Sequence, residues 1–130
     1  MLDNANETMC WCDDCQVAFR KYIAKKYTPK QIRDKFGVNS IDELQMGNRT
    51  KNRVIPTGPD DKKALLDTET SIFWYTLVGD WVKHLRDIAR QVDPDFQVAI
   101  NYAVRWFEPQ AWESCDYLIR ENVFGQDFGV

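Results

Sequence analysis

The feature that most constrains the fold of this chain is a long apolar stripe between residues 66 and 92. Its members recur with the three- and four-residue spacing of one helix face: Trp74, Leu77, Val78, Trp81, Val82, Leu85, Ile88, Ala89 and Val92. Pro94 follows, and proline cannot continue a helix. The spacing therefore predicts one amphipathic helix over 66–92, with Trp74 and Trp81 in the protein core.

Two shorter helical segments are predicted ahead of this stripe. Apolar residues that recur every fourth position predict a helix over about 13–27, with Asp13 or Asp14 as its cap. Residues 28–31 (Thr-Pro-Lys-Gln) match a capping box with proline in the first turn, so a second helix begins there and ends at Gly37.

A long polar segment separates these helices from the apolar stripe. Residues 40–43 (Ser-Ile-Asp-Glu) match a second capping box and predict a brief helical turn. Residues 45–63 contain glycines and prolines and follow neither the helical nor the strand period. We interpret 45–63 as a surface loop inserted into a single unit that spans 1–130.

Short β-prone segments flank the helices. Residues 1–9 are predicted to hold the end of a strand and a loop, and 96–101 and 116–121 are predicted as strands. Strands that alternate with helices along a chain are typical of parallel α/β architecture. The expected fold class is therefore α/β, with parallel strands and one long amphipathic helix.

Three of the four cysteines lie in the sequence Cys10-Trp-Cys12-Asp-Asp-Cys15. Such clustering favours a metal site over a disulfide framework, whose cysteines would be spaced along the chain. Thiolates separated by one and by two residues can converge on a tetrahedral zinc, which takes four ligands. Cys115 is the only other cysteine and so the only local candidate for the fourth ligand. Reduced structural thiols and a disulfide between Cys12 and Cys15 remain the alternatives.

Charge and composition exclude several classes of function. The 130 residues carry 17 basic and 20 acidic side chains, a net charge of −3, which argues against a nucleic-acid partner. No apolar run approaches the roughly 20 residues of a membrane span. His84 is the single histidine and lies on the polar side of its helix, so a Ser-His or Cys-His catalyst is not expected. Residues 1–8 lack the pattern of a secretory signal, and a cytoplasmic location is favoured.

The segment from Asn6-Glu7 through the cysteine cluster to Tyr27 resembles (β/α)8 TIM-barrel glycoside hydrolases, most of all the family 42 β-galactosidases. In that family an Asn-Glu or Asp-Asn pair ends the fourth barrel strand, and a Cys-x-Cys-x-x-Cys cluster and an aromatic-rich helix follow. The stretch from Phe73 to Asn101 is similar to the next helix and strand. Because a complete barrel needs about 250 residues, the resemblance implies a middle fragment, about strands four to six.

The resemblance also implies an activity, the hydrolysis of O-glycosidic bonds, with a carbohydrate as partner. That chemistry needs two carboxyl groups. Glu7 is the family-based candidate for the acid/base, and Glu121 ends a predicted strand. The remaining candidates would bind substrate, and they are Asp3, Asn4, Asn101 and Trp106. The pairs Asp3-Asn4 and Asn6-Glu7 compete for the position at the strand end.

Two further expectations concern the chain alone. The family's nucleophile lies on a seventh strand that this chain lacks, so we expect no activity from the chain by itself, and exposed strand edges would favour self-association. In the family, the cysteines bind a structural zinc with a fourth cysteine from an earlier strand. The alternative is a small zinc-stabilised α/β module that binds a carbohydrate or a protein without catalysis.

Overall fold

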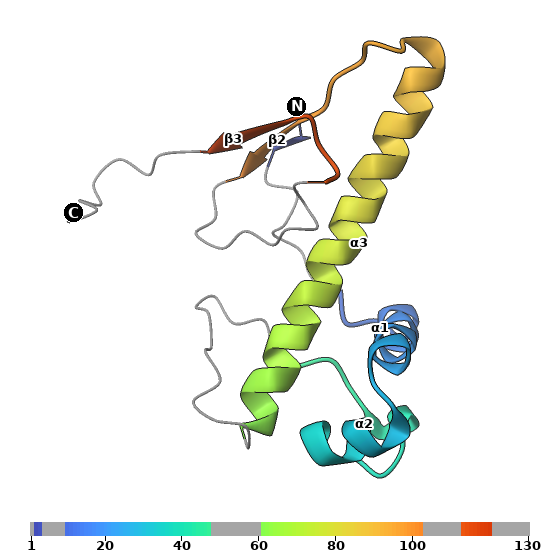
Figure 1. The fold of residues 1–130 in the computed structure, drawn as a ribbon, viewed down its shortest axis with the longest axis vertical. Coiled ribbons are helices and arrows are strands. Elements are labelled where there is room, and N and C mark those ends of the chain that lie inside the picture. The colour runs from blue at the N-terminus through green and yellow to red at the C-terminus, as the bar shows by residue number, and fades with distance from the viewer. Residues whose placement is uncertain (1, 4–9, 48–60, 103–112, 121–130) are drawn as a thin grey trace, which may run out of the picture. The chain divides into compact units, whose positions relative to one another are not determined.

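The structure is a computed structural model, and it describes residues 2–3, 10–47, 61–102 and 113–120 (Figure 1). The chain divides into two compact units. We call Met9–Trp74 the helical unit, and Met1–Thr8 together with Tyr75–Val130 the sheet unit. One long helix, α3 (Lys62–Val92), contributes its first part to the helical unit and its last part to the sheet unit.

The helical unit begins with α1 (Asp13–Lys26) and α2 (Pro29–Phe36), which confirms both predicted helices. The predicted capping box at the start of α2 is also present, because the Thr28 hydroxyl accepts from the Gln31 amide while the Gln31 side chain accepts from the Thr28 amide. Gly37 ends α2 with a φ of 73°, in the left-handed region that glycine adopts without strain.

A short 3-10 helix, η1 (Ile41–Glu43), follows α2 and is capped by the Ser40 hydroxyl. The segment directly after η1 is still part of the core, since Leu44 and Met46 are buried. Residues 48–60, which form most of the loop expected over 45–63, lie outside the described residues. The helix α3 then begins at Lys62, four residues earlier than the apolar spacing predicted.

The core of the helical unit forms where α1 packs against the first part of α3. Phe19 is fully buried, and its ring meets the Phe73 ring edge to face at a centroid distance of 5.4 Å. The side chains of Ile23, Ile32 and Leu44 are buried in the same unit. Burial of each such side chain stabilises the fold by about 1.5–3 kcal/mol. This core fixes the position of α1 and therefore of the cysteines at its start.

A buried carboxylate also joins α1 to α3. Glu69 on α3 is only 4% exposed, and it accepts hydrogen bonds from the Tyr22 and Tyr27 hydroxyls and pairs with Lys26 at 2.7 Å. Burial and the adjacent Glu69 carboxylate raise the pKa of Tyr27 well above its usual range. The carboxylate is thus supplied with three donors, as a buried charge requires.

Among its described residues, the sheet unit contains three short parallel strands in the order β1 (Leu2–Asp3), β2 (Ala99–Tyr102) and β3 (Tyr117–Arg120). Asp3 is the register partner of Asn101, which is in turn the partner of Ile119. The β2 and β3 strands are shorter than the segments predicted at 96–101 and 116–121.

A carboxylate anchors the start of β2 and β3 to the last part of α3. Asp116 accepts from the Val98 amide at 2.9 Å and from the Arg90 guanidinium at 2.8 Å. The backbone bond from Val98, followed by the nearby Arg90 and Arg86, lowers the pKa of Asp116 below its usual range. The sheet is therefore held to α3 through the ionised carboxylate.

The expected fold class, an α/β partial (β/α)8 barrel, is wrong for this chain, although the short strands of the sheet unit are parallel. Helix dominates the described residues, because α1, α2 and α3 contain 14, 8 and 31 residues, whereas the strands contain 2, 4 and 4. The physical reason lies between β1 and α3, where a barrel would alternate strand and helix. In this stretch the capping residues Thr28 and Ser40 start helical turns instead of strands. Ile32, on the helix that Thr28 caps, is buried in the core of the helical unit.

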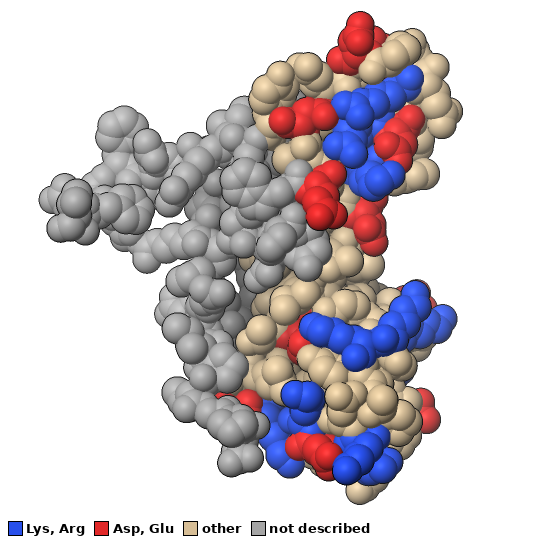
Figure 2. Space-filling view, viewed as in Figure 1, with Lys and Arg blue, Asp and Glu red and all other residues tan. Residues whose placement is uncertain are grey.

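The apolar stripe on α3 is only partly buried, which corrects the placement of Trp81 in the core. Val82 is fully buried, but Trp81 is 50% and Val92 is 90% exposed. Trp74 is half-buried. No helix among the described residues has the length and hydropathy of a membrane span. On the face shown in Figure 2, Lys and Arg side chains are interspersed with Asp and Glu side chains.

Candidate functional site

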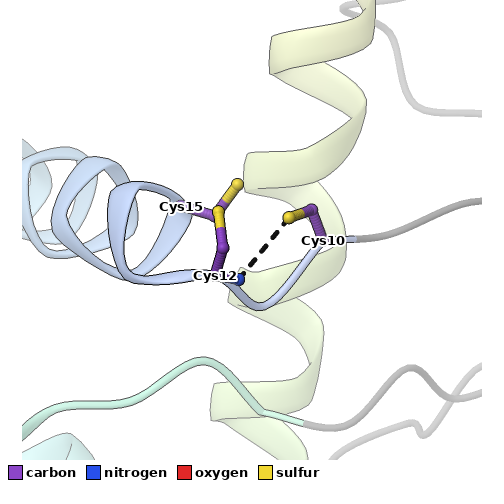
Figure 3. Close-up of side chains that lie close together, drawn as sticks. All are labelled: Cys10, Cys12 and Cys15. Carbon is purple, nitrogen blue, oxygen red and sulfur yellow. Dashed lines mark hydrogen bonds between the residues drawn. The ribbon is translucent and has the colours of Figure 1, made fainter.

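The three clustered cysteines converge at the start of α1, as the sequence predicted (Figure 3). The sulfur atoms of Cys10, Cys12 and Cys15 all lie within 4.8 Å of one another. Cys12 is exposed, whereas Cys10 and Cys15 are half-buried. All three are free thiols in the structure, so the cluster can donate sulfur ligands or react as thiols.

Helix geometry explains the convergence. Cys12 occupies the N-cap of α1 with an extended backbone, in place of the predicted Asp13 or Asp14, and its carbonyl accepts the first helical hydrogen bond from Gln16. Cys15 therefore lies in the first turn, on the helix face above the cap. Asp13 and Asp14 become the first two helical residues, where their charge suits the helix dipole.

Contacts with the segment after η1 hold the cluster in place. The Trp11 indole donates to the Gly47 carbonyl at 3.2 Å, and the Gln16 side chain accepts from the Met46 amide at 2.9 Å. The Gly47 amide in turn donates to the Thr70 hydroxyl on α3 at 2.8 Å. These three bonds link both sides of the cysteine cluster to α3 within the helical unit.

The cluster makes its thiols unequal. A hydrogen bond from the Cys15 backbone, followed by contact with the Cys10 thiol, lowers the pKa of Cys12. Burial raises the pKa of Cys15 to about 12, and its hydrogen bonds with the Cys10 and Cys12 thiols contribute to the rise. Without a cation, the exposed Cys12 thiol thus ionises more readily than the Cys15 thiol.

The donor set fits a metal ion that prefers sulfur. Thiolates around a tetrahedral zinc lie about 3.8 Å apart, given a Zn–S bond of about 2.3 Å. The separations in the cluster, all within 4.8 Å, exceed that value by at most about 1 Å. A bound cation would also reverse the raised pKa of Cys15, because coordination deprotonates a thiol. Three ligands are therefore available to a metal within the helical unit.

The fourth cysteine belongs to the sheet unit. Cys115 is half-buried just before β3, and burial and the neighbouring Asp116 raise its pKa. The group of residues with metal-ligand geometry contains Cys10, Cys12 and Cys15 among the described residues. Cys115 as a fourth ligand stays a prediction.

Two of the predicted substrate-binding residues lie in register in the sheet unit. Asp3 on β1 and Asn101 on β2 are backbone partners in the parallel pair, so they occupy the same level of the sheet near the carboxyl ends of their strands. Four other predicted residues, Asn4, Glu7, Trp106 and Glu121, lie outside the described residues. The assignment of all six as site residues stays a prediction.

The sequence did not indicate several residues that position the cluster. Trp11 and Gln16 reach the segment after η1, and Gly47 approaches α3 at Asp67 so closely that a β-carbon would collide with the Asp67 backbone and carboxylate. A polar segment that contains glycine is a weak signal of such close approach. His84, which the sequence placed on the polar face, is exposed on α3.

Known proteins similar to this chain are β-galactosidases. No protein-family model matches. The chain is 26% identical over 98 residues to β-galactosidases of Geobacillus kaustophilus and of Geobacillus sp. strain Y412MC61, a match that covers 72% of this chain. The structure is also similar to a polyextremophilic β-galactosidase from the Antarctic haloarchaeon Halorubrum lacusprofundi, with a TM-score of 0.64, 23% identity and 87% of this chain covered.

The share of the relatives that this chain spans is small. The match covers 14% of each Geobacillus protein and 17% of the haloarchaeal chain. The comparisons support a relationship to glycoside hydrolases, and the likeness to the haloarchaeal structure shows a shared fold over that part. The chain is thus similar in sequence and in fold to one segment of much longer β-galactosidases.

Proposed function

We propose that this chain is a segment of a β-galactosidase-like glycoside hydrolase that acts on O-glycosidic bonds. The observation that supports the proposal is the agreement between two comparisons, since β-galactosidases match 72% of the chain in sequence and 87% in structure. A carbohydrate is therefore the substrate class we assign. The activity belongs to the longer protein of which such a segment is a part.

In this proposal the cysteine cluster is a structural metal site. Cys10, Cys12 and Cys15 would hold a zinc ion, with a fourth ligand that completes the coordination and closes the site to water. A closed zinc stabilises its surroundings and does not supply a nucleophile. The hydrogen bonds of Trp11 and Gln16 to the segment after η1 hold the start of α1, and with it the cysteines, in position for the metal.

The proposed acid/base is Glu7, and Glu121 is the second candidate carboxyl group. A retaining glycosidase needs one carboxyl group that protonates the leaving oxygen and another that attacks the sugar, about 5–5.5 Å away. Asp3 and Asn101, whose backbones lie in register in the sheet, are proposed to bind sugar hydroxyls together with Asn4 and Trp106. The nucleophile is proposed to lie outside this chain.

A chimeric enzyme tests the proposal. The part of the Geobacillus kaustophilus β-galactosidase that this chain matches is replaced by the full 130-residue chain, and hydrolysis of a chromogenic galactoside is measured. We expect a folded chimera to hydrolyse the substrate, and Glu7→Gln to lower kcat by about 10²–10⁴-fold. Glu43→Gln, at an exposed carboxylate of η1, is the matched control and should leave kcat unchanged.

Two results would contradict the proposal. A folded chimera with no activity on galactosides would remove the assigned function, and full activity of the Glu7→Gln chimera would remove the assigned acid. The chain alone is expected to be inactive, because the attacking carboxylate is proposed to lie outside it. Galactoside hydrolysis by the purified 130-residue chain would refute that expectation.

A second candidate function rests on the helical unit alone. The cysteine cluster and its supporting bonds all lie within Met9–Trp74, so a metal-stabilised binding module needs none of the residues proposed for catalysis. Such a module would bind a carbohydrate or a protein. Galactose binding by calorimetry that survives Glu7→Gln, together with an inactive chimera, would favour this candidate.

A further inference from the structure

We propose that Cys12 and Cys15 form a redox-active pair that reacts with small-molecule disulfides. In this reaction Cys12 attacks the disulfide and Cys15 resolves the mixed disulfide that results. The inference rests on the geometry of the three thiols and their surroundings, and it does not depend on the glycosidase proposal.

The positions of the two thiols on α1 separate their roles. Cys12 is exposed at the N-cap, so a dissolved disulfide can reach its sulfur, whereas Cys15 is half-buried in the first turn. Their sulfur atoms lie within 4.8 Å of each other (Figure 3). A Cys-x-x-Cys pair at the start of a helix is the arrangement in which thiol–disulfide exchange proceeds readily.

Cys10 is placed for a different role. Its sulfur accepts a hydrogen bond from the Cys12 backbone amide at 3.5 Å, shown by the dashed line in Figure 3. The Trp11 indole is anchored to the Gly47 carbonyl, which restrains the residue between Cys10 and Cys12. Cys10 therefore stabilises the turn before α1, and Cys15, in the first turn of a regular helix, is the remaining thiol within 4.8 Å of the Cys12 sulfur.

The exchange balances as two substitutions at sulfur. The Cys12 thiolate attacks one sulfur of oxidised glutathione, a Cys12–glutathione bond forms, and one glutathione thiolate leaves. Cys15 then loses its proton and attacks the Cys12 sulfur, and the second glutathione thiolate leaves. The cysteine pair loses two electrons and two protons, and the oxidised glutathione becomes two reduced glutathione molecules.

Oxidation and metal binding compete for the same sulfur atoms. A Cys12–Cys15 disulfide would leave Cys10 alone of the three clustered thiols, and one thiol cannot hold zinc in a closed site. We therefore expect zinc to protect the pair and oxidation to release zinc. A chain that holds this cluster would exchange its metal according to the local redox conditions.

The test uses the full 130-residue chain, reduced and freed of metal, with oxidised glutathione as the probe. Free thiols are titrated and intact masses measured after an acid quench. We expect the wild-type chain, Cys10→Ser and Cys115→Ser to lose two thiols each and to retain no glutathione. The Cys10→Ser/Cys15→Ser double variant should keep one glutathione on Cys12, because no thiol in the cluster can resolve it. Circular dichroism of each variant checks that it is folded.

The rate of the first step identifies the attacking thiol. With Cys12→Ser we expect thiol loss at least about tenfold slower than with Cys115→Ser, because the half-buried Cys15 is poorly accessible. One equivalent of zinc should slow oxidation of the wild-type chain by a similar factor. An intramolecular disulfide that persists in Cys15→Ser but is lost in Cys10→Ser would overturn the proposal, as would four free thiols in the treated wild-type chain or no protection by zinc.

Discussion

The two parts of α3 show how differently one continuous helix can be used. In the helical unit Ala64 and Thr70 are buried, and Phe73, which packs on the Phe19 ring of α1, is 3% exposed. In the sheet unit Val82 is buried, but Trp81, Leu85, Ile88 and Val92 are exposed. Eight of the nine stripe residues lie in the sheet unit, where several of them are exposed, so the apolar spacing alone does not determine burial.

The difference lies in what packs on each part. The helical unit supplies α1, whose Phe19 and Tyr22 rings pack on Phe73 of the first part of α3. The sheet unit supplies three short strands, and the described residues leave one stripe of the helix open. Exposed apolar stripes mark surfaces that pack against other protein. The helical unit therefore has a core of its own, and the last part of α3 has a surface suited to further contacts.

The largest effect that should distinguish the two parts is loss of an aromatic core residue. Phe19→Ala removes the ring that packs on Phe73, and we expect a loss of about 3–5 kcal/mol in the free energy of unfolding. Trp81→Ala removes a larger ring that is half exposed, and its cost should be under about half of that. Urea unfolding followed by circular dichroism measures both. Equal losses would show that the stripe is as well packed as the core.

A smaller effect is expected where the chain approaches α3 most closely. Gly47→Ala places a β-carbon against Asp67 and should strain the bond between the Gly47 amide and Thr70, at a cost of about 1–3 kcal/mol. Gly37→Ala is the matched control, since its β-carbon meets only the flexible Lys62 side chain, and its left-handed backbone costs about 1 kcal/mol. The same urea titration applies. A Gly47→Ala chain as stable as wild type would show that the close approach of Gly47 to Asp67 does not restrict the side chain at this position.

The sequence predicted those features that depend on neighbouring residues. The capping box at 28–31, the end of α2 at Gly37 and the convergence of the cysteines all follow from residues a few positions apart. Burial of Glu69 and the approach of Gly47 to Asp67 join residues 20 or more positions apart, for which a single sequence holds no local signal. The fold class failed for the same reason, because short β-prone segments do not reveal how much helix surrounds them.

A titration in alkali should weaken the helical unit first. The pKa of Tyr27 is raised by burial and by Glu69, so the folded state favours the neutral phenol. The resulting stability is fully present below the unfolded value of about 10 and is lost as the pH rises through the folded value. Tyr27→Phe should flatten this dependence between pH values of about 9 and 12, measured by urea unfolding at each pH. An unchanged slope in Tyr27→Phe would show that another group controls the alkaline limb.

A titration in acid should weaken the sheet unit first, and the loss of stability should be smaller than the loss that the helical unit shows in alkali. The pKa of Asp116 is lowered by the Val98 amide and by Arg90, so the folded state favours the carboxylate. This stability is present above the unfolded value of about 3.9 and is lost as the pH falls through the lower folded value. The effect is the smallest because Asp116 is partly in contact with solvent, which screens its pairs. The protection factor of the Val98 amide, which corrects for the intrinsic pH dependence of exchange, should fall below that range, and Asp116→Asn should show the lower protection at neutral pH as well. If the protection of the Val98 amide in the wild-type chain is the same at neutral pH as below the folded pKa of Asp116, the carboxylate does not hold β2 and β3 to α3.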